Sequence, residues 1–363
     1  MARQAEKTIK LALQGGGSHG AFTWGVLDQL LADERIRIEG VSGTSAGAMN
    51  AVALADGMAR GGAAEARDRL ERFWSATSAA AQYSPIQRSI VDVFMGNWSL
   101  DTSPAYIFSD HLTRLFSPYD LNPLDLNPLR DVVGRCIDFD RVNDPTGVKV
   151  FLTATNVRTG RPKIFRQPGV TLDSVMASAC LPLLYKAVEI DGEAYWDGGY
   201  MGNPALFPLV DECDAGDLVL IQINPFYRPD VPRSARDIQN RLNEITFNAS
   251  LLKELRSLAF LWEIIHHENL ERERYRDARI HAIHDEETML GLGVSSKLNA
   301  EWGFLTYLRD QGRKAAQNWL SRHYDDLGIR NSLDLSWIFD ESLKPAHLEE
   351  GADRDYRIRA VAR

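Results

Sequence analysis

Gly43-Thr44-Ser45-Ala46-Gly47 is the stretch that decides how this chain is interpreted. It follows β-type sequence over 36–42 and precedes Ala, Met, Val and Leu at helical spacing over 46–55. A G-x-S-x-G between a strand and a helix is the pattern of a nucleophile elbow, in which the serine occupies a strained turn. The N-terminus of the following helix favours negative charge that develops beside the serine. The same five letters also occur in ordinary turns, so the surrounding sequence decides.

A glycine-rich loop precedes the elbow. Residues 8–14 alternate as a strand does, 21–31 are typical of a helix, and Gly15-Gly16-Gly17-Ser18-His19-Gly20 lies between them. Strand, loop, helix and elbow strand predict a βαβ unit with two parallel strands. We therefore expect the loop and Ser45 to meet at one edge of a sheet. Consecutive glycine amides at this position suit an oxyanion hole.

The loop also fits a dinucleotide-binding pattern, G-x-G-x-x-G, through Gly15, Gly17 and Gly20. Glu39 lies 19 residues beyond Gly20, near where a ribose-binding acid would fall. Against this alternative, the next strand ends at once in the serine elbow. We therefore expect no cofactor.

A candidate carboxylate follows a predicted hairpin. Residues 187–190 and 193–196 are typical of two strands, and Asp191-Gly192 is a two-residue hairpin signal. The returning strand ends in Asp197-Gly198-Gly199, where two glycines allow another backbone to approach closely. By itself this is a turn or a helix-capping acid. Beside Ser45, Asp197 becomes a candidate general base.

The rest of the chain predicts an α/β core of about 1–230 and a mainly helical region over 231–363 that packs on it. The last dozen residues have the composition of a disordered tail. The expected elements are a helix over 64–80, irregular aromatic-rich sequence over 83–131, strands over 147–155, 162–166, 217–223 and 279–283, and helices over 172–179, 237–275 and 305–324. An apolar stripe on the 237–275 helix predicts burial against the core, with a lipid-facing surface as the alternative.

Composition and charge narrow the class of protein. The chain has 363 residues, of which 44% are hydrophobic and 25% charged, as in ordinary globular proteins. Its formal net charge of -9 disfavours nucleic acid, because phosphate neutralisation needs a basic surface. Cys136, Cys180 and Cys213 show no disulfide or zinc spacing, which favours a reducing compartment. Without an apolar leader or a run of about 18 apolar residues, we expect a soluble, cytoplasmic protein.

Taken together, the three glycine-containing blocks resemble the patatin-like phospholipase family. Gly15–Gly20, Gly43–Gly47 and Asp197–Gly199 have the family's order and spacing, over about the first 210 residues. The resemblance implies a three-layer α/β/α fold with a mostly parallel central sheet and a helical C-terminal extension. It also implies hydrolysis of lipid carboxylic esters by a Ser–Asp dyad through a covalent acyl-enzyme.

The resemblance assigns roles by position. Ser45 is the implied nucleophile and Asp197 the implied base. The implied oxyanion-hole amides are those of Gly15, Gly16 and Gly17. The residues implied to support the elbow and the turn are Gly43, Gly47, Gly198 and Gly199. An isolated carboxyl has a pKa of about 4 and is a weak base for serine, so desolvation and the oxyanion hole must contribute.

Two positions depart from the family pattern, and they leave the substrate open. Many members have Asp before the glycines and Arg inside the loop, where this chain has Gln14 and His19. His19 is a candidate substrate contact, with a structural hydrogen bond as the alternative. Phospholipid or lysophospholipid is the expected substrate. An intracellular polyhydroxyalkanoate depolymerase or another esterase is the alternative, and transient contact with a membrane or lipid granule fits each of them.

Three other interpretations compete with the Ser–Asp dyad. A Ser-Asp-His triad would take its base from the late histidines, His266, His267, His281, His284, His323 or His347. His281 and His284, followed by acidic residues, suggest a metal, but on a strand they face opposite sides, so we expect none. A catalytically silent lipid-binding protein would keep the fold, although intact Ser45 and Asp197 argue against it.

Overall fold

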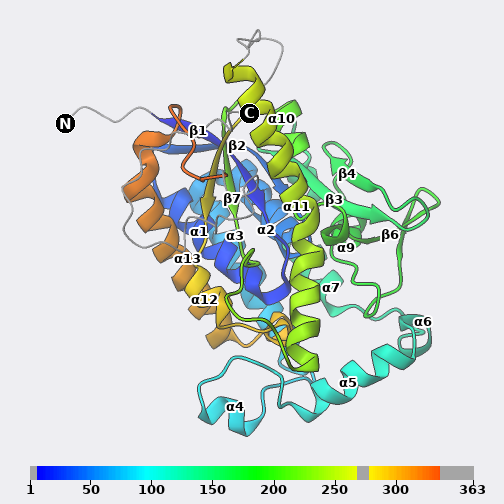
Figure 1. Ribbon diagram of the computed structural model, residues 1–363. Helices are drawn as coiled ribbons and strands as arrows, with labels where there is room; N and C mark the ends of the chain where they lie inside the picture. Colours follow the sequence, from blue (N-terminus) through cyan, green and yellow to red (C-terminus); the bar gives the residue numbers. More distant parts are fainter. Residues whose placement is uncertain (1–5, 268–277, 336–363) are drawn as a thin grey trace.

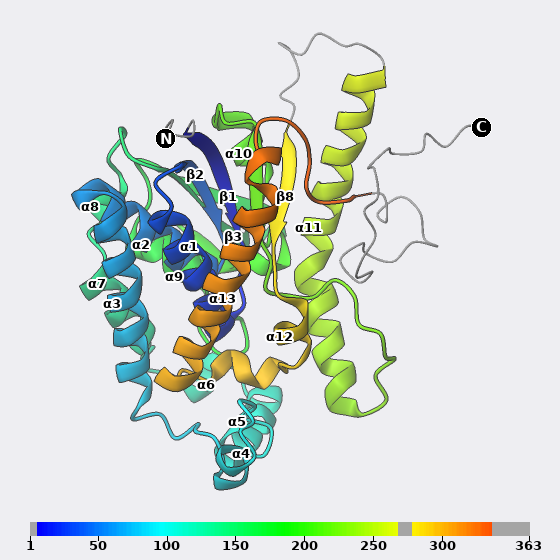
Figure 2. The ribbon, with the colours of Figure 1, turned by 90° about the vertical axis from the view of Figure 1, so that its left-hand side faces the viewer.

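The structure, a computed structural model, describes residues 6–267 and 278–335 (Figures 1 and 2). The strands are β1 (Lys7–Leu13), β2 (Ile36–Gly43), β3 (Lys149–Asn156), β4 (Pro162–Arg166), β5 (Val188–Ile190), β6 (Glu193–Asp197), β7 (Asp217–Ile221) and β8 (Arg279–Ile283). The α-helices are α1 (Gly20–Ala32), α2 (Ala46–Gly61), α3 (Ala63–Ala81), α4 (Ile90–Phe94), α5 (Pro104–Leu115), α6 (Pro118–Leu121), α7 (Pro128–Cys136), α8 (Phe139–Val142), α9 (Leu172–Ser178), α10 (Phe207–Glu212), α11 (Ala235–His267), α12 (Glu286–Leu290) and α13 (Trp302–His323). Short 3-10 helices are η1 (Gly17–His19), η2 (Gly198–Tyr200), η3 (Val294–Leu298) and η4 (Tyr324–Asp326).

One mixed sheet runs through the described residues in the order β5-β6-β3-β2-β1-β7-β8, and β4 pairs with β3. Strands β3, β2, β1, β7 and β8 are parallel, whereas β4, β5 and β6 join by antiparallel pairing. The predicted βαβ unit is confirmed, because β1 and β2 are parallel with Leu13 opposite Gly43. The glycine loop and the serine elbow therefore leave the sheet at the same edge.

Different helices cover the two faces of the sheet (Figure 2). On β1, Ile9, Leu11 and Leu13 enter a core shared with α1, α2, α3 and α13. Ala12, which points the other way, enters a second core with α10 and α11. This alternation along a buried strand confirms the three-layer α/β/α architecture with a mostly parallel sheet.

The apolar stripe predicted on the long helix α11 is buried at four of its positions and half-buried at Leu252, Leu258 and Trp262. Leu251, Leu255, Ala259 and Ile265 are all buried, and the first three belong to the core on the α10 side of the sheet. The alternative of a lipid-facing stripe is therefore wrong for these residues.

Helix α13 packs closely along α1 because two glycines face the opposite backbone. A Cβ at Gly25 would lie 1.9 Å from the Arg309 carbonyl oxygen, and a Cβ at Gly312 would lie 2.1 Å from the Phe22 carbonyl oxygen. No side chain fits at either point, so the C-terminal helix and the first helix form a single layer.

The segment expected to be irregular contains helices α4 to α7, including the twelve-residue α5. Ser103 caps α5 by accepting from the Tyr106 amide, and Pro104 occupies its first turn. None of the α5 residues is buried, which explains why no core-facing stripe marked the helix. Figures 1 and 2 show α4, α5 and α6 projecting from one end of the molecule.

The region after residue 230 contributes to the same sheet through β8, which pairs with β7 from Asp217–Arg279 to Ile221–Ile283. A boundary near 230 stays a prediction. The predicted C-terminal tail and His347 lie outside the described residues. Among the described residues, no helix is both long and apolar enough to cross a lipid bilayer.

Candidate active site

Ser45 occupies a strained turn between β2 and α2. Its backbone has φ 56° and ψ -121°, a conformation that side-chain-bearing residues rarely adopt. The Ser45 amide donates to Ser178 Oγ at 3.0 Å, and the Thr44 hydroxyl donates to the Gly202 carbonyl at 2.6 Å. These two bonds hold the turn against the segments around it. Ser45 is also the residue that precedes α2, so the positive end of the helix dipole lies at its backbone.

The glycines on both sides of Ser45 are fixed by close backbone contacts. A Cβ at Gly43 would lie 2.4 Å from the Gly47 carbonyl oxygen, and a Cβ at Gly47 would lie 2.2 Å from the Leu13 carbonyl oxygen. A Cβ at Gly15 would lie 2.6 Å from the Thr44 carbonyl oxygen and 2.8 Å from the Ser45 Cβ. The glycine loop and the elbow therefore touch.

Asp197 is the last residue of β6, and β3 lies between β6 and the strand β2 that leads to the elbow. Its Cα lies opposite Ala154 of β3, and β3 neighbours β2, which leads to Ser45. A Cβ at Gly198 would lie 2.0 Å from the Thr153 carbonyl oxygen, so only glycine lets the turn fold back onto β3. The side chain of Asp197 is fully buried, with one oxygen accepting from the Gly199 amide at 2.7 Å.

Burial changes the chemistry of the Asp197 carboxyl. Loss of water raises its pKa to about 7, although the Gly199 amide, the nearby Ser45 hydroxyl and the Lys297 ammonium all favour the ionised form. Its second oxygen, Oδ2, has no hydrogen-bond partner of standard geometry among the described residues. A buried carboxylate with a free lone pair and a pKa near neutrality has the properties of a general base.

The glycine loop holds its three amides differently. The Gly15 amide donates to Asn203 Oδ1 at 2.6 Å, which differs from the expectation that this amide faces an oxyanion. No acceptor is found among the described residues for the amides of Gly16 and Gly17. Gly17 is exposed and has φ 58°, whereas Gly15 and Gly16 are buried. Within residues 6–267 and 278–335, two amides of the loop are therefore unpaired.

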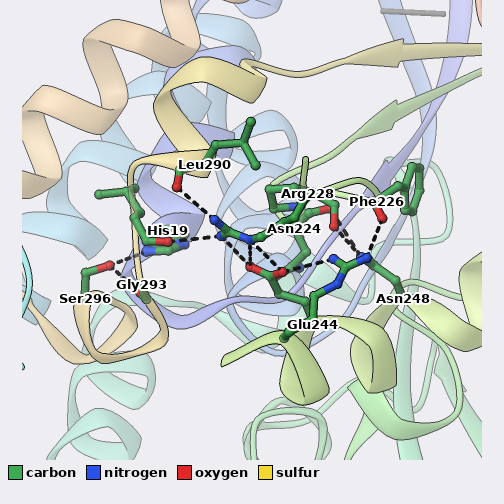
Figure 3. Close-up of polar contacts among 12 residues, drawn as sticks. His19, Asn224, Phe226, Arg228, Glu244, Asn248, Leu290, Gly293 and Ser296 are labelled. Carbon is green, nitrogen blue, oxygen red and sulfur yellow. Dashed lines mark hydrogen bonds and ion pairs between the residues drawn. The ribbon is translucent and has the colours of Figure 1, made fainter. Parts of the chain in front are cut away.

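His19 connects the loop to η3 (Figure 3). Its Nε2 lies 2.8 Å from Ser296 Oγ, and the Ser296 hydroxyl donates to the Gly293 carbonyl at 2.7 Å. Because that hydroxyl has only one proton, Nε2 must be the donor to Ser296. Burial, followed by the charges of Lys297 and Arg228, lowers the pKa of His19 well below its usual value, so the ring is neutral. This geometry favours the structural alternative for His19.

Gln14 supports the other end of the loop. Its Oε1 accepts from the amides of Ile223 and Asn224 at 2.8 Å and 2.9 Å. Its Nε2 donates to Asn248 Oδ1 at 3.1 Å, and the Asn248 side chain donates in turn to the Pro225 carbonyl. Figure 3 shows Asn224 and Asn248 beside each other. Gln14 therefore ties the end of β1 to the segment after β7 and to α11.

The late histidines do not assemble a triad with Ser45 among the described residues. His281, in the middle of β8, is buried, with Nε2 3.1 Å from Asp217 and Nδ1 2.9 Å from Ser332. His284 follows β8, which is three strands from β2 and so about 14 Å away at ordinary strand spacing. His323 pairs with Asp326 at 2.8 Å. The positions of the His266 and His267 side chains lie outside what the structure describes.

Comparison with known proteins identifies the family. The sequence matches the family described as Patatin-like phospholipase over residues 11–210, more than half of the chain. This chain belongs to the patatin-like phospholipase family. The match contains Ser45, Asp197 and the whole glycine loop. No curated protein matches the sequence.

Two of the solved structures that match this chain come from bacteria. One is VipD from Legionella pneumophila, at 15% identity, with 85% of this chain and 67% of that one covered and a TM-score of 0.35. Another is ExoU of Pseudomonas aeruginosa, solved in complex with SpcU, at 14% identity, with 86% and 53% covered and a TM-score of 0.29. This chain therefore spans about half of ExoU.

Several residues of the site were missed from the sequence. Asn203, Asn224, Ser178, Ser296 and Lys297 all contact the glycine loop or the elbow. Each is a single polar residue in a connecting segment or at a helix end, and nothing in its local pattern marks it. Among residues 6–267 and 278–335, no cluster of His, Cys, Asp and Glu is suited to a metal ion.

Proposed function

We propose that this patatin-like protein is a serine hydrolase that cleaves lipid carboxylic esters with Ser45 and Asp197. The observation that carries the proposal is a serine on a strained elbow beside a buried carboxyl whose pKa is about 7. A base with a pKa near the working pH combines a useful ionised fraction with enough proton affinity to assist a serine. Desolvation supplies the basicity that an ordinary carboxyl lacks.

The reaction proceeds in two acyl transfers. Asp197 Oδ2 accepts the proton of Ser45 as Oγ attacks the ester carbonyl, and the resulting tetrahedral intermediate collapses when Asp197 returns that proton to the leaving alcohol. Water then attacks the acyl-enzyme with Asp197 as base, and Ser45 recovers its proton as the fatty acid leaves. The amides of Gly16 and Gly17, together with the α2 N-terminus, stabilise the oxyanion. Gly15 contributes as well if its amide leaves Asn203.

The segment that projects from the fold supports a lipid substrate. Its exposed apolar side chains, which we call the apolar cap, are Ile90, Val91, Val93, Phe94, Met95, Phe108, Leu115, Phe116, Tyr119, Leu121, Leu124 and Leu126. Ser99 and Leu100 bind Ser295 in η3, the same short helix that holds His19. The cap is therefore anchored next to the glycine loop. Exposed apolar patches of this kind mark binding surfaces, and we propose transient contact with a lipid surface.

Hydrolysis of a short p-nitrophenyl ester tests the dyad. We expect Ser45→Ala and Asp197→Asn each to lower kcat/KM by about 10⁴-fold or more, since removing one member of a catalytic unit abolishes most of its effect. Ser75→Ala, at an exposed serine of α3, serves as the matched control. Full activity in Ser45→Ala, or loss of activity in His284→Gln, would contradict the dyad.

Substrate choice is then resolved by comparing phosphatidylcholine vesicles, lysophospholipid micelles and polyhydroxybutyrate granules. We expect the highest turnover on phospholipid. Phe94→Ser should weaken vesicle binding and vesicle hydrolysis but leave soluble-ester hydrolysis unchanged, whereas the control Ile329→Ser, another exposed apolar residue, should change neither. Binding to vesicles with no hydrolysis of any ester would favour the silent lipid-binding protein instead.

A further inference from the structure

Lys297 touches the glycine loop although it lies far beyond the family match, which ends at residue 210. It belongs to η3, and a Cβ at Gly17 would lie 2.4 Å from the Lys297 carbonyl oxygen. The adjacent Ser296 accepts the hydrogen bond from His19. Backbone contact and hydrogen bond together fix the position of Lys297 relative to the unpaired amides of the loop.

The side chain of Lys297 reaches between the two catalytic turns. Its Nζ donates to Asn224 Oδ1 at 2.8 Å, and the side-chain Nδ2 of Asn224 donates to the Gly15 carbonyl at 2.9 Å. On the other side, Nζ lies 5.8 Å from the centroid of the Phe247 ring. That ring packs where a Cβ at Gly199 would lie, 2.3 Å from it. The ammonium therefore lies between the loop of Gly15 and the turn of Asp197.

The other charges around Lys297 are already compensated (Figure 3). Glu244 of α11 is paired with Arg228 at 2.6 Å and with Arg241 at 3.2 Å. Arg228 also donates to the Leu290 carbonyl at 2.9 Å, which fixes its guanidinium. His19 is neutral, as described above. Of the two acidic groups that act on Lys297, Glu244 and Asp197, only Glu244 has an ion pair with another residue in the part of the chain that the structure describes.

We infer that Lys297 is a positioning residue of the proposed hydrolase, whose ammonium keeps Asp197 ionised for proton transfer from Ser45. The inference rests on the proposed function and adds a residue from the C-terminal region to its machinery. Two of the three ammonium protons remain without an acceptor among the described residues, so the same group can also face an oxyanion at the loop. Its charge attracts the carboxylate and opposes the effect of burial on it.

The acid–base properties of the neighbours agree with this role. Burial lowers the pKa of Lys297 to about 8, even though Glu244 and Asp197 favour the charged form. Asp197 is ionised above about pH 7, so both charges coexist in a narrow window around neutrality. Burial, followed by the charge of Asp197, raises the pKa of Tyr200, and burial and Asp197 also raise the pKa of Cys180, so both groups are neutral in this window. We expect kcat/KM to form a bell with limbs near these two pKa values.

Lys297→Met and Lys297→Arg test the inference through the pH profile of ester hydrolysis. Removing the cation should move the acidic limb upward by roughly half a unit, because the carboxylate loses a charge that favours it, and lower the maximum about threefold. Arginine stays charged, so Lys297→Arg should retain the acidic limb and lose the alkaline limb. A merely structural lysine would change the height of the profile and leave its limbs in place.

The controls separate this inference from the proposed function. Lys314→Met, at an exposed lysine of α13, should keep the wild-type profile. If Ser45→Ala retains activity, the proposed hydrolase itself is wrong. If Ser45→Ala is inactive while both Lys297 variants keep the wild-type limbs, only the role of Lys297 is wrong. If thermal unfolding shows that Lys297→Met is not folded, Lys297→Arg alone tests the inference. Loss of its alkaline limb would support the role of Lys297, and an unchanged alkaline limb would overturn it.

Discussion

Two buried aspartates, one at each edge of the same sheet, have opposite environments. Asp197, at the end of β6, accepts one amide hydrogen bond, and its Oδ2, close to the Ser45 hydroxyl, has no hydrogen-bond partner of standard geometry in the described part of the chain. Asp217, at the start of β7, accepts from Arg279 at 2.8 Å, from the Gly328 amide at 3.0 Å and from His281 at 3.1 Å. Burial raises the pKa of both carboxyls, but at Asp217 the hydrogen bonds from His281, Arg279 and Gly328 outweigh it and hold the pKa well below its usual value.

The difference separates function from stability. A carboxylate whose lone pairs are all used stabilises the fold and cannot accept a further proton near neutrality. A carboxylate left partly unsatisfied destabilises the fold, and in the proposed mechanism it accepts the proton of Ser45. The parallel strands place loops with free amides at one edge, and β7 and β8 begin at the other with a compensated ion pair. Substitutions at Asp217 should therefore change stability, and substitutions around Asp197 should change catalysis.

Asp217→Asn should cause the largest change in stability. The Arg279 guanidinium would lose its carboxylate, and breaking a buried pair costs about 3 to 5 kcal/mol. Because the pKa of Asp217 is depressed in the folded state, this stabilisation exists above its ordinary pKa and is lost in acid. Urea unfolding at neutral pH and at about pH 2 measures both effects, because the stabilisation is lost only as the pH falls below the ordinary pKa of about 4.

The same Asp217 variant should keep wild-type kcat/KM at temperatures where it is folded. Asp211→Asn, at an exposed residue of α10, is the control for the loss of one negative charge. A large fall in kcat/KM of folded Asp217→Asn would break the contrast, because it would give the distant carboxylate a part in the reaction.

Asp197→Asn should stabilise the protein, increasingly so as the pH rises. A raised folded-state pKa means that stability is complete below the unfolded value of about 4 and is lost as the pH rises to about 7. At 1.36 kcal/mol per pKa unit, wild type should lose roughly 2 to 3 kcal/mol between about pH 5 and pH 8 from this group, and the variant should not.

Thermal unfolding of wild type and Asp197→Asn across that pH range measures the difference. Asp191→Asn, in the exposed hairpin turn, removes an equal charge without the burial. Parallel curves for wild type and Asp197→Asn would show that the Asp197 carboxyl is not destabilised by its site.

Ser296→Ala should have the smallest effect. It leaves the buried Nε2 proton of His19 without an acceptor, which typically costs about 1 to 2 kcal/mol. Since this bond ties the glycine loop to η3, we also expect kcat/KM to fall about threefold to tenfold, an effect of the same order in free energy. Ser257→Ala, an exposed serine on α11, provides the control for both measurements. Unchanged stability would show that water replaces the hydroxyl.

Much of the fold could be predicted because its elements carry local signals. Alternating apolar residues marked β1, a continuous apolar run marked β7, and Asp191-Gly192 marked the hairpin before Asp197. Helix α5 was not predicted, because none of its residues is buried and so its sequence carries no core-facing apolar stripe. Its one local signal is Ser103-Pro104, an N-cap followed by a proline in the first turn. Glycines also located the candidate site, since close backbone approach at Gly47 and Gly198 leaves room for no other residue.

The supporting residues could not be predicted, because their partners are distant in sequence. Asn203 reaches Gly15 across 188 positions, and His19 reaches Ser296 across 277. Neither contact follows a helical or strand period. Lys297 is the clearest case: a single lysine in a short turn, whose relation to Asp197 arises only when β8 and α13 bring the chain back to its first helix.

Because β8 pairs with β7, the first 230 residues cannot form the complete central sheet by themselves. A fragment that stops near residue 230 would contain every signature glycine and both members of the proposed dyad, Ser45 and Asp197. It would nevertheless lack the neighbour of β7, whose five residues are all buried in the intact chain. An unpaired apolar edge is a template for self-association, so such a fragment should be recovered as aggregate. Domain shuffling among relatives would meet the same obstacle, because the exchanged part includes a strand of the central sheet.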